Sequence, residues 1–310
     1  MRSWTVRRRG GARARVAAGM QRLFELVGIE PRSRFDRVGS LGIHAVEAGS
    51  GPPLLLIHGA SGGCANWYRL LPALAREFRV LAPDLPGFGL SETAAPQAPI
   101  GRWTAARLAE WLDAIGWSTG GVIGTSFGGQ VALRLALDGP ARVRRLVVLN
   151  ATGLGREVSW LARLASLPGL RRQAAASSRA GTAWLLRRVL TTDRSLLSPE
   201  HERALVFYLH ASSMVSGRVI RATFRHVIGP SGQLEIVSEA DLASIGMPTL
   251  LLWGAADPFL PPAHGLRAAG RLPNGRFEAL RGVGHSPNWE RPDTVLERLR
   301  PFLLGDATPA

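Results

Sequence analysis

Short apolar runs bounded by glycine, proline and asparagine recur along most of the chain. Their length favours strands, at residues 43–47, 54–57, 78–82, 121–124, 145–149, 249–253 and 276–280. Apolar residues at helical spacing alternate with most of these runs, at residues 65–76, 103–115, 127–138, 262–272 and 292–304. A strand, a helix and a further strand form a right-handed crossover, and repeated crossovers build a mostly parallel sheet with helices on both faces. The pattern therefore predicts the α/β class.

The strand pattern stops between Gly155 and about Ala240. Helical stretches rich in Trp, Leu and Arg replace it, at residues 158–167, 180–190, 199–214 and 216–227. We interpret residues 151–240 as an inserted helical cap, so that the sheet domain comprises residues 35–150 and 241–310. Residues 1–34 are expected to form a basic N-terminal arm.

The chain has 310 residues, of which 46% are hydrophobic, and a formal net charge of +15. All 38 basic residues are arginine, and they are spread along the chain without a nucleic-acid-binding motif, so no nucleic-acid partner is expected. Six arginines lie within residues 1–19, where we see no apolar periodicity. A weak contact of this segment with an acidic membrane surface stays open. A protein starting at Met20 is expected to fold. No apolar run reaches the roughly 20 residues of a membrane span, which favours the cytoplasm. The oligomeric state is left open.

A single cysteine, Cys64, excludes internal disulfides and cysteine-based metal clusters. We interpret it as a small, half-buried apolar residue.

The pattern Gly-x-Ser-x-Gly occurs three times, centred on Ser61, Ser118 and Ser126. It carries chemistry only as a sharp turn between a strand and a helix, which exposes the serine hydroxyl above a sheet. Ser118 lies between a predicted helix and a strand, and further glycines separate Ser61 from the next helix. Ser126 directly follows the strand 121–124 and directly precedes the helix 127–138, so it is the predicted nucleophile.

A serine hydroxyl needs a base to remove its proton, and the base needs an acid that orients it. His285 is the candidate base, because it lies in a loop between the last predicted strand and the C-terminal helix. Asp257 is the candidate acid, because it lies just past the carboxyl end of the strand 249–253, and Pro258 fixes the turn after it. Asp84 also ends a strand and remains an alternative acid.

These residues resemble the α/β-hydrolase superfamily over roughly residues 35–304. The order Ser126, Asp257, His285 is the family's order of nucleophile, acid and base. Three more segments resemble family loops: the His-Gly pair at 58–59, the sequence Asp-Leu-Pro-Gly-Phe-Gly at 84–89, and the segment 284–292, which begins Gly-His and ends Glu-Arg-Pro. The resemblance implies an oxyanion hole formed by the backbone N–H groups of Ala60 and Phe127.

The resemblance implies a serine hydrolase that cleaves a carboxylic ester of a small to medium, apolar substrate through an acyl-enzyme, without metal or cofactor. Trp160 and Trp184 of the cap are the expected substrate-binding residues. Similar carbon-carbon bond hydrolases of aromatic ring-cleavage products are an alternative, although they have Asn and Trp where Thr125 and Ser286 stand. An acyltransferase using the same triad is a second alternative. A binding protein on this fold is disfavoured because all three triad residues are present.

Overall fold

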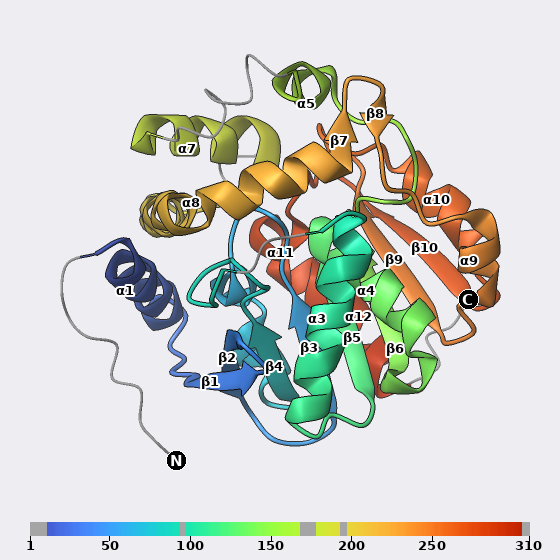
Figure 1. Cartoon of the computed structure of the whole chain (residues 1–310), viewed down its shortest axis with the longest axis horizontal. Helices are drawn as coiled ribbons and strands as arrows, with labels where there is room; N and C mark the ends of the chain where they lie inside the picture. The colour runs from blue at the N-terminus through green and yellow to red at the C-terminus, as the bar shows by residue number, and fades with distance from the viewer. Residues whose placement is uncertain (1–10, 94–96, 168–177, 193–196, 306–310) are drawn as a thin grey trace.

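The structure is a computed structural model that describes residues 11–93, 97–167, 178–192 and 197–305. Its centre is an eight-stranded sheet in the order β1-β2-β4-β3-β5-β6-β9-β10 (Figure 1). The strands are β1 Arg32–Val38, β2 Leu41–Ala48, β3 Pro53–Ile57, β4 Arg79–Pro83, β5 Gly120–Thr125, β6 Val143–Leu149, β9 Thr249–Gly254 and β10 Gly275–Leu280. The strands from β4 to β10 pair in parallel, whereas β1 with β2 and β2 with β4 pair antiparallel. The predicted α/β class is confirmed.

Side chains alternate between the two faces of the sheet, and each face has its own hydrophobic core. On β3, Leu54 and Leu56 belong to one core, whereas Leu55 and Ile57 belong to the other. The 3₁₀-helix η1 Cys64–Trp67 and the helices α2 Leu71–Leu74 and α12 Pro292–Leu304 contribute to the first core. The helices α3 Ile100–Ala114, α4 Phe127–Asp138 and α10 Ala263–Ala269 contribute to the second. Two short helices complete this part of the chain, η2 Pro140–Arg142 and α11 Pro287–Glu290.

Helices dominate the chain between β6 and β9. They are α5 Trp160–Ala165, α7 Arg179–Leu185 with the π-helical turn η3 Leu186–Leu190, α8 Pro199–Val227 and α9 Glu239–Ser244. A small hairpin, β7 Ile228–Gly229 and β8 Gly232–Gln233, follows α8. The two helices predicted over 199–214 and 216–227 are one helix of 29 residues. A helix can continue through Gly217 because one glycine costs only about 1 kcal/mol there.

The helix α8 packs over the loop that leaves the carboxyl end of β4. A Cβ atom on Gly87 would collide with the side chain of Val219, so the loop backbone touches α8 directly. In Figure 1, α5, α7 and α8 lie together at one end of the sheet. This is the arrangement that a cap requires, and the division into core and cap remains a proposal.

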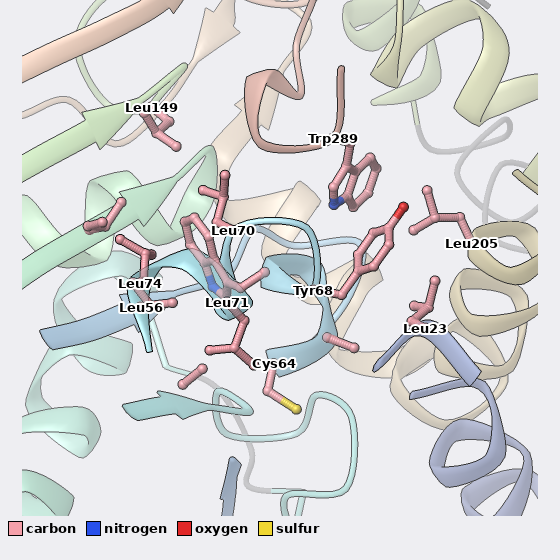
Figure 2. Close-up of a cluster of buried hydrophobic side chains, with 14 of the residues drawn as sticks. Leu23, Leu56, Cys64, Tyr68, Leu70, Leu71, Leu74, Leu149, Leu205 and Trp289 are labelled. Atoms are coloured by element: carbon pink, nitrogen blue, oxygen red, sulfur yellow. The ribbon is translucent and has the colours of Figure 1, made fainter. Parts of the chain in front are cut away.

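Residues 12–25 correct the expectation of an arm without apolar periodicity, because they form the helix α1 Ala12–Glu25. Val16, Met20, Leu23 and Phe24 form its buried face, which packs against α8. Gly19 allows this close approach, since a Cβ atom there would lie 3.0 Å from Cα of Tyr208. Figure 2 shows Leu23 opposite Leu205, with Cys64 and Tyr68 in the same cluster. The sheet also begins earlier than residue 35, because β1 starts at Arg32.

None of the helices among the described residues is both long enough and apolar enough to cross a membrane.

Candidate active site

Ser126 occupies a strained turn between β5 and α4. Its backbone has φ 53° and ψ −122°, a conformation that costs a residue other than glycine free energy. Two glycines make the turn sterically possible. A Cβ atom on Gly124 would overlap the carbonyl oxygen of Gly128, and a Cβ atom on Gly128 would overlap that of Ile57. The Ser126 N–H donates to the Leu149 carbonyl at 2.9 Å, which ties the turn to β6.

His285 and Asp257 meet Ser126 at the carboxyl edge of the sheet. His285 Nε2 lies 3.1 Å from Ser126 Oγ, and His285 Nδ1 lies 2.9 Å from Asp257 Oδ2. The tautomer that donates its Nδ1–H to Asp257 leaves Nε2 free to accept the serine proton. The three residues come from loops after β5, β9 and β10, so the sheet brings them together from distant parts of the sequence.

The side chain of Asp257 is buried, and its carboxylate accepts several hydrogen bonds. Burial alone would raise its pKa, but the charge of His285 and the bonds from His285, Asn150 and the Phe259 N–H outweigh burial, so the net pKa is lowered. Its Oδ1 accepts N–H donors from Phe259 at 2.7 Å and Leu260 at 3.1 Å. Asp257 therefore remains ionised beside His285.

Asn150 directly follows β6 and is not among the predicted site residues. Its side-chain Nδ2 donates to Asp257 Oδ2 at 2.6 Å and to the Gly284 carbonyl at 3.2 Å. Its Oδ1 accepts the Gly254 N–H at 3.2 Å. The side chain is fully buried, and φ is 42°, in the left-handed region that asparagine tolerates better than most residues. Asn150 thus joins the loops that carry Asp257 and His285.

The loop after β3 lies against Ser126. A Cβ atom on Gly59 would lie 3.1 Å from Cβ of Ser126, so only a residue without a side chain fits there easily. His58 is buried. Its Nδ1 lies 2.7 Å from the Gly59 carbonyl oxygen, and its Nε2 accepts the Leu85 N–H at 2.9 Å. Ala60 follows this pair and is half-buried, and Phe127 begins α4 directly after Ser126. The assignment of their N–H groups to an oxyanion hole stays a prediction.

Asp84 lies in a different hydrogen-bond network. Its carboxylate accepts the N–H groups of Cys64 at 2.6 Å and Leu90 at 2.8 Å and contacts His44 Nδ1 at 2.7 Å. Burial would raise the pKa of Asp84, but the charge and hydrogen bond of His44 lead the effects that lower it overall. The structure therefore places Asp257, and not the alternative Asp84, against His285.

His44, Cys64 and Asp84 carry metal-ligating atoms within 4.8 Å of one another. Burial, together with the charge of Asp84, raises the pKa of the Cys64 thiol well above its ordinary value, which disfavours the thiolate that metals bind. The carboxylate is already occupied by hydrogen bonds. These residues fit a structural cluster better than a metal site.

The other candidate residues lie elsewhere. Ser118 is exposed between α3 and β5, and Ser61 is half-buried in the loop after β3. Trp160 and Trp184 lie on α5 and α7 and are 69% and 54% exposed. Their role in substrate binding stays a prediction. Two surface hollows, of about 540 and 300 Å³, are lined by none of the residues Ser126, Asp257 and His285.

Comparison with known proteins adds four findings. The family model described as the alpha/beta hydrolase fold matches residues 52–292. The 2-hydroxymuconate semialdehyde hydrolase of Pseudomonas putida is 30% identical, over 83% of this chain and 89% of that protein. The crystal structure of a membrane phospholipase A, described as a bacterial virulence factor, is 26% identical with a TM-score of 0.77, covering 95% of this chain and 92% of that one. Carboxylesterase CesB of Bacillus subtilis, 22% identical with a TM-score of 0.75 over 95% and 99% of the two chains, shares the fold.

Proposed function

The chain belongs to the alpha/beta hydrolase fold family, and on that premise we propose that it cleaves carboxylic esters through an acyl-enzyme formed on Ser126. The contact of Ser126 Oγ with His285 Nε2 at 3.1 Å, with Asp257 on the other ring nitrogen, carries the proposal. We expect the substrate to be a small to medium, apolar ester.

In the first half of the proposed reaction, Ser126 Oγ attacks the ester carbonyl carbon while its proton moves to His285 Nε2. The carbonyl oxygen becomes an oxyanion, which the N–H groups of Ala60 and Phe127 would bind; such a donor is typically worth about 3–4 kcal/mol in the transition state. When the carbon-oxygen bond breaks, His285 returns the proton to the leaving alcohol. Asp257 stabilises the positive ring between these two transfers.

In the second half, water attacks the acyl group on Ser126 and His285 again accepts and returns one proton. The acid leaves and the serine hydroxyl is restored. The N-terminus of α4 points at this site and favours the negative charge that develops. In this proposal, residues 35–150 and 241–310 supply the chemistry and residues 151–240 cover the substrate.

A carbon-carbon bond hydrolase is the second candidate. The 30% identity to the hydrolase of P. putida, over most of both chains, favours it. Thr125 and Ser286 argue for the ester, because the ring-cleavage hydrolases that this chain resembles have asparagine and tryptophan there.

The test combines a fluorophosphonate probe with two substrate classes. We expect the probe to label Ser126, and Ser126→Ala to lower kcat for p-nitrophenyl esters by about 10³-fold or more. Ser118→Ala is the matched control, because this exposed serine lies in the same Gly-x-Ser-x-Gly pattern outside the site. Labelling of Ser61 would overturn the assignment of the nucleophile.

Substrate class is decided by running an ester panel beside a ring-cleavage dienone. Higher kcat/KM for the dienone than for every ester would establish the second candidate. Transfer of the acyl group to an added alcohol in preference to water would make the protein an acyltransferase.

A further inference from the structure

The cap exposes large apolar side chains. Five of them lie on two short helices: Trp160 (69% exposed), Leu161 (42%) and Leu164 (43%) on α5, and Trp184 (54%) and Leu185 (38%) on α7. Single exposed apolar residues are ordinary, but several on the same short helices mark an interaction surface. We call these five residues the outer cap face. In Figure 1, both helices lie beyond α8, farther from the sheet.

A basic groove of about 300 Å³ lies beside α7, where α1, α7 and α8 meet. Arg22, Arg179 and Arg203 line it together with Phe207, Ala204 and one acid, Glu200. Arg22 and Glu200 form an ion pair, which leaves the groove with a net positive charge. The guanidinium of Arg179 also lies 5.9 Å from the ring centre of Phe207. The groove thus offers an anion two further guanidinium groups next to an apolar ring.

We propose that the outer cap face and the basic groove dock the protein on an anionic phospholipid surface. Tryptophan and leucine side chains partition into the boundary between headgroups and acyl chains. Arginines beside them attract the negative surface, and a guanidinium binds a phosphate group in a bidentate way. The two features supply the apolar and the electrostatic part of the same attraction.

Charge favours a lipid surface over a second copy of the chain. A two-fold symmetric dimer through this face would bring two positively charged grooves toward each other, because both copies present the same surface. An anionic lipid surface neutralises the groove instead. Docking goes beyond the proposed ester hydrolysis and does not require it, so its test can use a protein that lacks the nucleophile.

The experiment measures co-sedimentation of the Ser126→Ala protein with vesicles of phosphatidylcholine alone or mixed with phosphatidylglycerol. The first variant combines Trp160→Ser with Trp184→Ser, and the second combines Arg179→Glu with Arg203→Glu. The matched charge control combines Arg76→Glu with Arg144→Glu. Arg76 and Arg144 are exposed at the amino ends of β4 and β6, opposite to the cap.

We expect the protein with the unmodified face to bind the mixed vesicles. The arginine variant should weaken binding by about tenfold or more, because each arginine near an anionic surface contributes roughly fivefold. The tryptophan variant should weaken binding by about tenfold or more, because it removes two side chains that partition into the boundary between headgroups and acyl chains. The control should weaken binding much less than the arginine variant. Equal losses in the control and in the arginine variant would overturn the proposal, since binding would then follow net charge alone. Unchanged binding of the tryptophan variant, or no binding at all, would also overturn it. A dimer that the tryptophan variant dissociates, without vesicle binding, would assign the face to self-association instead.

Discussion

Replacing Asn150 tests whether the acid and the base of the proposed triad depend on a third side chain. Asn150→Gly removes the amide but keeps the freedom to adopt φ 42°. Asn150→Asp keeps the shape and also tolerates this φ, but it replaces the donating Nδ2 by a carboxylate oxygen. The comparison separates the loss of a hydrogen bond from the addition of a negative charge.

The size of each effect follows from the contacts of Asp257. A hydrogen bond to a charged group contributes about 1.5–3 kcal/mol, which corresponds to roughly 10- to 150-fold in rate if it is lost in the transition state. After Asn150→Gly, Asp257 still accepts from His285, Phe259 and Leu260, so we expect a loss near the lower end, about tenfold in kcat.

Asn150→Asp should cost more. The new carboxylate would stand about where Nδ2 now lies 2.6 Å from Asp257 Oδ2, and two carboxylates this close cannot both ionise in a buried site. They would share one proton on the oxygen that faces His285. This resembles partial neutralisation of the acid, for which we expect a loss of about 10²–10³-fold, below the roughly 10⁴-fold of full neutralisation.

The assay is kcat and KM for a p-nitrophenyl ester, with thermal unfolding of each variant to exclude loss of fold. Both variants should lower kcat more than they change KM, because Asn150 lies behind the triad rather than at the substrate. A normal kcat in Asn150→Gly would refute the positioning role. An Asn150→Asp protein that is as active as Asn150→Gly would refute the argument from paired carboxylates.

Three further predictions concern the acid, the helix α1 and the response to pH. Asp257→Asn should keep the melting temperature within a few degrees but lower kcat by about 10³-fold or more. Asp84→Asn should destabilise the protein by about 3 kcal/mol and leave kcat of the folded protein near normal. The reverse pattern would exchange the roles of the two aspartates. A protein starting at Met20 should melt several degrees lower, because it loses the buried Val16 and the close packing of Gly19 on α8, and an unchanged melting temperature would show that this packing contributes little. Burial lowers the pKa of His58, so its neutral form is favoured in the folded state. Urea unfolding should therefore show stability that is present above the unfolded pKa of about 6.5 and is lost as the pH falls below it. A flat profile of unfolding free energy against pH would contradict this.

The strands could be predicted from the sequence because a buried parallel strand is a short, continuous apolar run. Each of the seven predicted strands lies within or overlaps an observed one. The edge strand β1 was missed because its side chains are exposed or half-buried, so Phe35 and Val38 alone gave no apolar run. The apolar face of α1 continues past Met20 to Leu23 and Phe24, and dividing the chain at Met20 hid its helical spacing.

Some site residues could likewise be predicted from the local sequence, whereas others depend on contacts between distant segments. The position of Ser126 follows from local sterics, because glycines two residues before and after it are needed in the turn wherever the rest of the chain goes. The role of Asn150 depends on the register of β6 with β9. Leu149 lies beside Leu252, so the residue that follows β6 reaches the Gly254 N–H and the Asp257 carboxylate. A shift of this register by one residue would move the amide away from Asp257 while leaving the composition of both strands unchanged. An asparagine at the end of an apolar run is also a common turn residue, so Asn150 could be assigned a role only once its neighbours across the sheet were known.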